Sequence, residues 1–278
     1  MSPRLAPLAL LLFTGAGLTF PRSPNASAQE VAELLGPLVL IGGRHQDLRN
    51  DIRDAFFELA GGKRAKIVVI PTAVALADKP EMLNEFRRPW LDLKPLSVEV
   101  LHTRDRKTAD DPVFVKPLTE ATAVFFTNGH GDRLFNAYHG TLVEKELKKL
   151  QARGGLIGGT GTGAVVLGDL AIDRVKADGP TEWSLGLLPG FLIHDRGDFE
   201  RLADVIAANP AKVGLMIDPA AAVVIRGKNL RVIGGGTVIV RLANGAGKEA
   251  KIDTLKSGGQ LDVIELRRAA ASRAGKKK

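Results

Sequence analysis

The chain has 278 residues, a formal net charge of +8, 45% hydrophobic residues and no cysteine. Without cysteine, disulfides, thiolate metal sites and a cysteine nucleophile are excluded, while the hydrophobic content is ample for one large core. Residues 267–278 carry Arg and Lys without any acid, and residues 29–266 are balanced in charge. We therefore expect a basic, disordered tail rather than a nucleic-acid-binding face.

Residues 1–28 have the pattern of a secretory signal peptide. Arg4 precedes an apolar stretch over residues 5–20, and the small residues Ala26, Ser27 and Ala28 follow. We expect cleavage before Gln29 and a secreted or periplasmic protein. No later stretch approaches the roughly 20 apolar residues of a spanning helix, so no transmembrane span is expected.

Short apolar runs alternate with helical patterns through the body of the chain. Strands are predicted at 37–43, 66–71, 97–102, 121–127 and 213–217, and helices at 47–59, 79–90 and 142–152. This alternation indicates an α/β fold of three layers, with a mostly parallel sheet covered by helices on both faces. The runs 223–226, 230–233 and 237–242, and a further strand at 261–266, predict an antiparallel C-terminal edge within a single domain of residues 29–266.

Residues 155–169, GLIGGTGTGAVVLGD, are the most distinctive stretch, because an apolar run enters a glycine cluster and continues as an apolar helical pattern. A strand, a tight turn and a helix beginning near Gly163 are predicted. The glycines permit positive φ in the turn, which suits a nucleophile elbow or an anion cradle. No serine or cysteine stands at the apex.

This stretch resembles the G-T-S-A-G-A elbow of the cyanophycinase and dipeptidase E family of serine peptidases, with Gly161 at the position of the nucleophile. The resemblance extends over residues 38–240 and implies a class I glutamine amidotransferase-like fold. A second motif agrees in order: residues 186–190 read G-L-L-P-G, as the family does. The resemblance also implies a substrate carboxylate held by arginines, for which Arg196 is the candidate.

The family's polar site residues are replaced elsewhere in the chain. Where the family reads G-G-D-Q, followed shortly by R-L, this chain has His130 for the acid and Gly131 for the glutamine, and it keeps the R-L pair. Pro219 replaces the glutamate of I-D-E-x-T-A, which would support the catalytic histidine. Either His194 occupies the place of that histidine, or the segment that carries the histidine is deleted, since this part of the chain is about four residues shorter than the family pattern. We favour the deletion.

These replacements predict a protein that has lost peptidase activity and keeps a binding or structural role. Thr160 and Thr162 flank the apex, and a turn-forming or capping role is favoured for both over a nucleophilic one. The alternative is an active hydrolase that uses a relocated constellation of Thr162, His130 or His194, and Asp218. Ligand binding is expected at Gly129, His130, Thr160, Gly161, Thr162 and Arg196, with a small carboxylate or a peptide as ligand.

No cofactor or metal is expected. The Gly159-x-Gly161-x-x-Ala164 spacing also fits a dinucleotide-binding fingerprint, but the next segment is too polar to supply the second strand. The histidines lack metal-ligand spacing, although convergence of His130 and His194 near the elbow stays open. A homo-oligomer is also left open.

Overall fold

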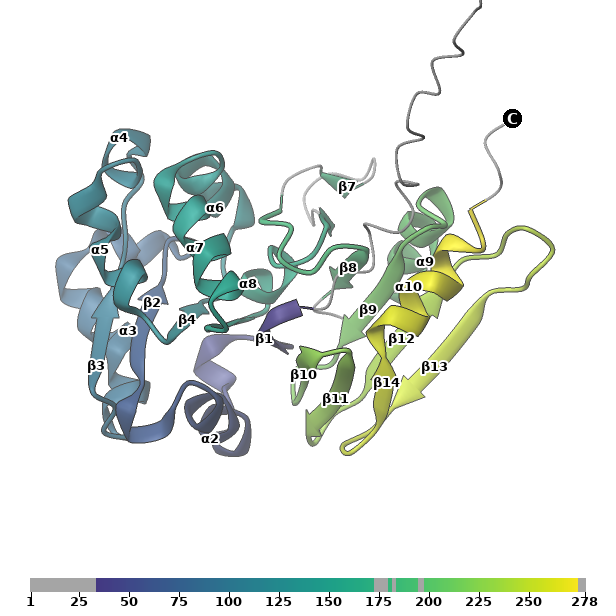
Figure 1. The fold of residues 1–278 in the computed structure, drawn as a ribbon, viewed down its shortest axis with the longest axis horizontal. Helices are drawn as coiled ribbons and strands as arrows, with labels where there is room; N and C mark the ends of the chain where they lie inside the picture. The colour runs from purple at the N-terminus through teal and green to yellow at the C-terminus, as the bar shows by residue number, and fades with distance from the viewer. Residues whose placement is uncertain (1–33, 173–179, 182–183, 195–197, 275–278) are drawn as a thin grey trace, which may run out of the picture. The chain divides into compact units, whose positions relative to one another are not determined.

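The computed structural model describes residues 34–172, 180–181, 184–194 and 198–274 (Figure 1). These residues all belong to one compact unit, Glu33–Lys278. The predicted signal peptide and Arg196 lie outside the described residues. In the described part of the chain, no helix is both long and apolar enough to cross a membrane.

An eight-stranded sheet forms the centre of the fold, in the order β14-β11-β10-β1-β5-β4-β2-β3. Five neighbouring strands are parallel, namely β1 (Leu34–Ile41), β5 (Leu156–Thr160), β4 (Ala123–Phe126), β2 (Lys66–Ile70) and β3 (Ser97–Val100). The strands β10 (Ala221–Gly227), β11 (Asn229–Gly234) and β14 (Gln260–Asp262) continue the sheet in antiparallel pairing. The predicted fold class is confirmed, and so is the antiparallel edge formed by the runs 223–226 and 230–233; the predicted strands at 213–217 and 237–242 lie in a second sheet instead.

Helices cover both faces of this sheet, as the apolar alternation predicts. On one face, α2 (Asn50–Leu59) and α3 (Pro80–Leu91) bury Phe56 and Trp90 against Phe125 of β4, with ring centroids 4.7–5.3 Å apart. The opposite face is covered by α5 (Pro112–Glu120), α6 (Gly131–Tyr138), α7 (Leu142–Ala152) and α8 (Thr162–Val165). Four short helices lie in the connections between these elements: η1 (His45–Asp47), η2 (Gly62–Arg64), η3 (Ala75–Asp78) and α4 (Arg106–Ala109).

A second sheet, which the sequence did not predict, has the order β13-β12-β9-β8-β6-β7. Its strands are β13 (Lys251–Leu255), β12 (Val238–Leu242), β9 (Val213–Ile217), β8 (Phe191–His194), β6 (Leu170–Ile172) and β7 (Pro180–Thr181), with α9 (Phe199–Ala208) packed against β9 and β12. The expectation that the segment after the elbow is too polar to supply a strand was wrong for β6 and β7. β6 forms because its backbone pairs with the apolar β8, which compensates for its shortness.

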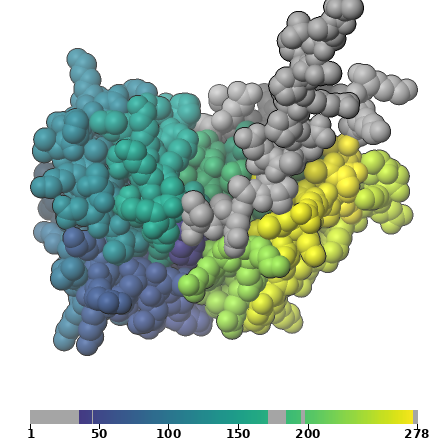
Figure 2. Space-filling model, viewed as in Figure 1, coloured from purple at the N-terminus to yellow at the C-terminus, as the bar shows by residue number. Residues whose placement is uncertain are grey.

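The C-terminal segment corrects the predicted strand at 261–266 and the predicted disordered tail from residue 267. Residues Val263–Ala271 form helix α10, whose first amides are capped by the carboxylate of Asp262. Leu266 and Ala270 are buried at 5% and 0% exposure, because apolar residues spaced by three and four positions face the core only in a helix. Figure 2 shows this yellow segment lying against the green strands, and α10 contacts β9 and β14.

Candidate functional site

The predicted strand–turn–helix elbow is present, with Gly161 alone between β5 and α8. Gly161 has φ 51° and ψ −120°, a backbone conformation that non-glycine residues adopt only under strain. Its amide donates to the carbonyl oxygen of Ile41 at 2.9 Å, and its own carbonyl accepts from the amides of Ala164 and Val165 at 2.9 and 3.0 Å. The apex is thus held by β1 on one side and by the first turn of α8 on the other.

Two further glycines allow α8 to pack closely on the sheet. A Cβ at Gly159 would lie 2.6 Å from the carbonyl oxygen of Gly163, and a Cβ at Gly163 would lie 2.5 Å from the carbonyl oxygen of Phe126. Neither distance is compatible with a side chain. The glycine cluster seen in the sequence is therefore explained by backbone approach as well as by the turn.

The loops that follow β2, β4 and β5 meet at this elbow. The hydroxyl of Thr162 donates to the carbonyl oxygen of Gly129 at 2.7 Å. The amide of His130 donates to the carbonyl oxygen of Ala73 at 2.9 Å, and Arg133 Nη1 reaches the same oxygen at 3.3 Å. Gly129 and His130 are exposed. The structure therefore brings together four of the predicted binding residues, because Thr162 and Gly161 are joined to Gly129 and His130.

Two buried hydroxyls lie beneath the elbow. Thr160 and Thr127 are 0% and 1% exposed, and neither hydroxyl has a hydrogen-bond partner among the described residues. The pairing of Phe126 with Gly159 places the two threonines at neighbouring positions on β5 and just after β4. A buried hydroxyl without a partner costs about 1–3 kcal/mol. The carboxyl edge of the sheet thus has unused hydrogen-bonding capacity directly under the turn.

The residues of the alternative catalytic constellation have other partners. The single proton of the Thr162 hydroxyl is donated to Gly129. The carboxylate of Asp218 accepts from the amide of Thr237 at 3.0 Å and from its hydroxyl. His194 is buried at the end of β8, 4% exposed.

Asp218 nevertheless lies near the elbow through its backbone. Gly42, which follows β1, has its Cα so close to the 217–218 backbone that a Cβ there would lie 2.6 Å from the carbonyl oxygen of Ile217. Since β1 is the neighbour of β5, the loop after β9 reaches the same edge of the sheet as Gly161. The sequence placed Asp218 in the right region, but its carboxylate is bound to Thr237.

A hydroxyl–imidazole–carboxylate chain that the sequence analysis missed lies after β2 and β3. Thr72 Oγ1 is 2.9 Å from His102 Nδ1, and His102 Nε2 is 3.0 Å from Asp78 Oδ1. Thr72 Oγ1 is also 2.6 Å from the hydroxyl of Tyr138. Thr72 and Tyr138 are 0% and 1% exposed, which keeps both hydroxyls from any substrate. The available signal was the presence of polar residues just after two predicted strands.

Burial and charge determine the protonation states of His102, Tyr138 and Asp78. Burial lowers the pKa of His102 below its usual value, even though the bond to Asp78 opposes that shift. Burial likewise raises the pKa of the Tyr138 hydroxyl to about 12. The hydrogen bond from Arg104, and after it the one from His102, lowers the pKa of Asp78. Near neutral pH the chain therefore holds a neutral imidazole, a protonated phenol and a carboxylate.

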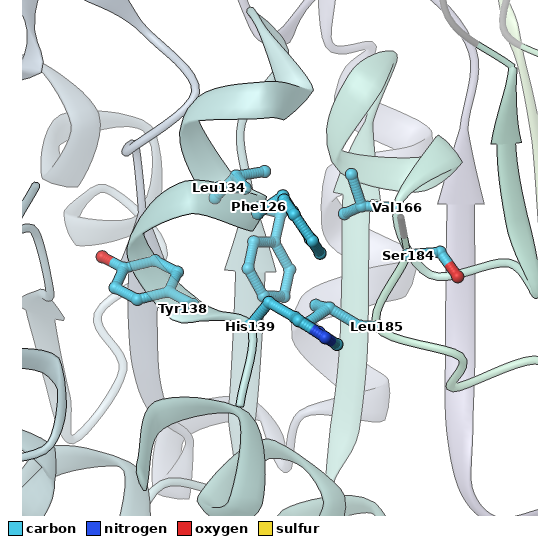
Figure 3. A pocket seen from close by; sticks show the side chains of 8 residues that line it. Phe126, Leu134, Tyr138, His139, Val166, Ser184 and Leu185 are labelled. Carbon is cyan, nitrogen blue, oxygen red and sulfur yellow. The ribbon is translucent and has the colours of Figure 1, made fainter. Parts of the chain in front are cut away.

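An apolar pocket lies between β4, α6 and α8 (Figure 3). Its lining residues are Phe126, Leu134, Phe135, Tyr138, His139, Val166, Ser184 and Leu185. The cavity volume of about 10 Å³ is close to the minimum for one water molecule. It is too small for an amino acid side chain, so the pocket does not identify a substrate. In the described ranges, no cluster of three His, Asp or Glu residues could hold a metal ion.

Comparison with known proteins agrees with this architecture. A sequence profile described as "Peptidase family S51" matches residues 38–233. A cyanophycinase of Synechococcus elongatus is 30% identical over 222 residues, 74% of this chain and 67% of that protein. A cyanophycinase of Nostoc sp. (strain PCC 7120) is 29% identical over 236 residues, 79% of this chain and 75% of that protein. The crystal structure of a peptidase from an acI-B1 Actinobacterium superposes with a TM-score of 0.66 at 21% identity, covering 84% of this chain and 99% of that one.

Proposed function

Because the chain belongs to peptidase family S51, we propose that it is an exported member that binds a small carboxylate or a peptide without hydrolysing it. The observation that carries this proposal is the conformation of Gly161. The apex keeps the φ of 51° and ψ of −120° at the sharp turn between β5 and α8, yet no side chain stands there. A peptidase of this type needs a hydroxyl at the apex with a base behind it.

The neighbouring hydroxyl does not compensate for this loss. Thr162 lies one residue beyond the apex, and its proton is donated to the carbonyl oxygen of Gly129. The carboxylate that could orient a base, Asp218, is bound by Thr237. Loss of a nucleophile alone costs several orders of magnitude in rate, so the absence of both parts supports a non-catalytic role.

Binding is supported by the exposed loop at the elbow. Gly129 and His130 are exposed beside the half-buried Thr162. The His130 imidazole supplies a donor that a carboxylate can use, and Arg196, which lies outside the described residues, is proposed to supply a second. The relatives' name, cyanophycinase, makes cyanophycin and Asp-containing dipeptides the first ligands to try.

Export is proposed from the N-terminal pattern alone. Arg4, the apolar residues 5–20 and the small residues before Gln29 form a secretory signal. Expression of the full chain in a bacterial host, followed by N-terminal sequencing of the periplasmic product, tests this. Recovery of the chain with Met1 intact in the cytoplasm would refute it.

A second candidate function is hydrolysis, favoured by one observation, the Thr72–His102–Asp78 chain. Its geometry meets the requirement that a hydroxyl contacts a base and the base contacts an orienting group. The complete burial of Thr72 argues against it. Fluorophosphonate labelling of the native chain, with a Thr72→Val variant as control, separates the two candidates, because only the hydrolase is labelled in a Thr72-dependent manner.

The proposal itself is tested with purified residues 29–278. Aspartate, Asp-containing dipeptides and cyanophycin are added in a thermal-shift assay, with the corresponding amides as controls, and product release is followed in parallel. We expect a rise in Tm with one of the carboxylates and no product above a heat-killed control. Turnover by the native chain would overturn the proposal.

A further inference from the structure

The hydrogen-bonded series of side chains from Tyr138 to Asp78 joins residues from four places in the fold. Tyr138 ends α6, Thr72 follows β2, His102 follows β3, and Asp78 ends η3. The three contacts between consecutive side chains measure 2.6, 2.9 and 3.0 Å. Only Asp78 is well exposed, with 54% of its side chain accessible, whereas 10% of the His102 side chain is. This series of hydrogen-bonded side chains thus runs from the core to the surface.

The hydrogen bonds of this series can all form when His102 is neutral. A neutral His102 with its proton on Nε2 donates to Asp78 and accepts at Nδ1 from the hydroxyl of Thr72. The Thr72 oxygen then accepts from the hydroxyl of Tyr138. The Tyr138 oxygen in turn accepts from the amide of Thr103 at 3.4 Å. In this arrangement the hydroxyl protons of Thr72 and Tyr138 each have an acceptor.

Protonation of His102 breaks this order. An imidazolium carries a proton on Nδ1 as well, so Thr72 must accept from it, and the contact between Thr72 and Tyr138 can then take the proton of only one of the two hydroxyls. The other hydroxyl proton is left without an acceptor among the described contacts, because the amide of Thr103 can only donate. A buried hydroxyl proton without an acceptor is costly, so the charged state strains the chain.

The same cluster fixes the loop that supports the elbow. Arg104 donates to the carbonyl oxygens of Thr72 and of Val74, the latter at 2.8 Å, and to Asp78 at 3.0 Å. Between those two carbonyls lies Ala73, whose own carbonyl accepts from the amide of His130. Thr72 is therefore one residue away from the contact that holds the loop carrying Gly129 and His130.

We infer that the Tyr138–Thr72–His102–Asp78 chain is a pH-dependent latch, which holds residues 71–74 against the 129–130 loop while His102 is neutral and releases them when His102 is protonated. The ionisable groups that act on His102 in the described residues are Asp78 on η3 and Arg104 on the loop after β3, and Tyr138 on α6 is reached only through Thr72. Asp78 favours the imidazolium, whereas Arg104 and burial oppose it. The inference concerns conformation and stands whether or not the elbow binds a ligand.

The test is an NMR titration of residues 29–278 from pH 8 to pH 5, in a His130→Gln background that removes the imidazole of the residue bonded to Ala73. The ring nitrogens of His102 and the backbone amides of Ala73 and Val74 are followed. We expect the Nε2-protonated tautomer at high pH, and amide shifts that share the His102 midpoint, which lies below 6.5. An Nδ1-protonated tautomer, or amides that do not follow His102, would overturn the latch.

Two variants complete the experiment. His102→Gln should abolish the pH dependence of the Ala73 and Val74 amides, whereas His139→Gln, which removes an exposed histidine bonded to Glu144, should preserve it. Loss of the response in both variants would overturn the inference. If His102→Gln fails to fold, the common midpoint of His102 and Ala73 in the parent chain still decides the question.

Discussion

The hydroxyl of Thr162 donates a 2.7 Å hydrogen bond to the carbonyl oxygen of Gly129, which joins the first residue of α8 to the loop after β4. This bond uses the hydroxyl proton that a nucleophilic threonine would have to give to a base. Thr162 therefore has a structural role that accounts for its presence beside Gly161. This bond fits the proposal that the elbow has no catalytic role.

Replacement of Thr162 by valine should reduce the free energy of unfolding by about 0.5–1.5 kcal/mol, because the elbow loses its hydrogen bond to Gly129. Urea denaturation measures this loss. Thr119→Val is a suitable control, since the Thr119 hydroxyl donates to the carbonyl oxygen of Lys116 within its own helix. Equal losses in the two variants would show that the contact between the loops contributes nothing specific.

Replacement of Gly42 by alanine should be strongly destabilising, by about 1–3 kcal/mol or more, because its Cβ would collide with the backbone of Ile217 and Asp218. Gly235→Ala is the matched control, since the nearest atom to a Cβ there is Arg49 Nη1 at 3.5 Å. Thermal unfolding of both variants checks the prediction. A Gly42→Ala variant as stable as the Gly235→Ala variant would refute the close approach of the loop after β9 to the end of β1.

Stability at alkaline pH should depend on Tyr138. Its pKa is raised to about 12 in the folded chain and is about 10 when unfolded. Between these values the unfolded state loses a proton that the folded state keeps, so stability falls as pH rises from 10 to 12, by about 2–3 kcal/mol in total. Denaturation across this range should show the fall in the native chain and a smaller one in Tyr138→Phe. Identical slopes would contradict the burial of the phenol.

Truncation should distinguish the two parts of the C-terminal segment. Removal of residues 263–278 deletes α10 with the buried Leu266 and Ala270, so Tm should fall by several degrees. Removal of residues 275–278 alone should leave Tm unchanged. If the chain truncated before Val263 had the same Tm as the full chain, α10 would not contribute to the core.

The parts of the fold that could be predicted are those that a local pattern of apolar and polar residues indicates. The strand over residues 66–70 is a buried run of apolar residues, and the helix over residues 142–152 has a clear apolar period, and both were predicted to within a residue. Helix α5 was missed because Pro112 and Pro117 obscure it, although Pro112 occupies the first turn, where a proline is tolerated. The second sheet depends on pairing between distant short strands, which no local pattern records.

The same division applies to the site. The elbow was predictable because Gly159, Gly161 and Gly163 lie within a single stretch of five residues that ends β5, makes the turn and begins α8. The Thr72–His102–Asp78 chain was not, because its members are 30 and 24 residues apart and meet only through the packing of two loops. The bonding of Asp218 to Thr237, 19 residues away, was hidden for the same reason. Sequence located the residues near the site but not their hydrogen-bond partners.

The most direct test of the proposal that the elbow is non-catalytic is the substitution Gly161→Ser, which places at the apex the serine of the family's pattern. The φ of 51° makes a side chain at this position strained, so the free energy of unfolding should fall by about 1–3 kcal/mol. Fluorophosphonate labelling of the folded variant, compared with the native chain and with heat-denatured variant, then reports whether a base faces the apex. We predict no labelling at position 161 above that of the denatured variant. Rapid labelling there, or release of product from cyanophycin, would contradict the account, because it would mean that a working base still faces the elbow.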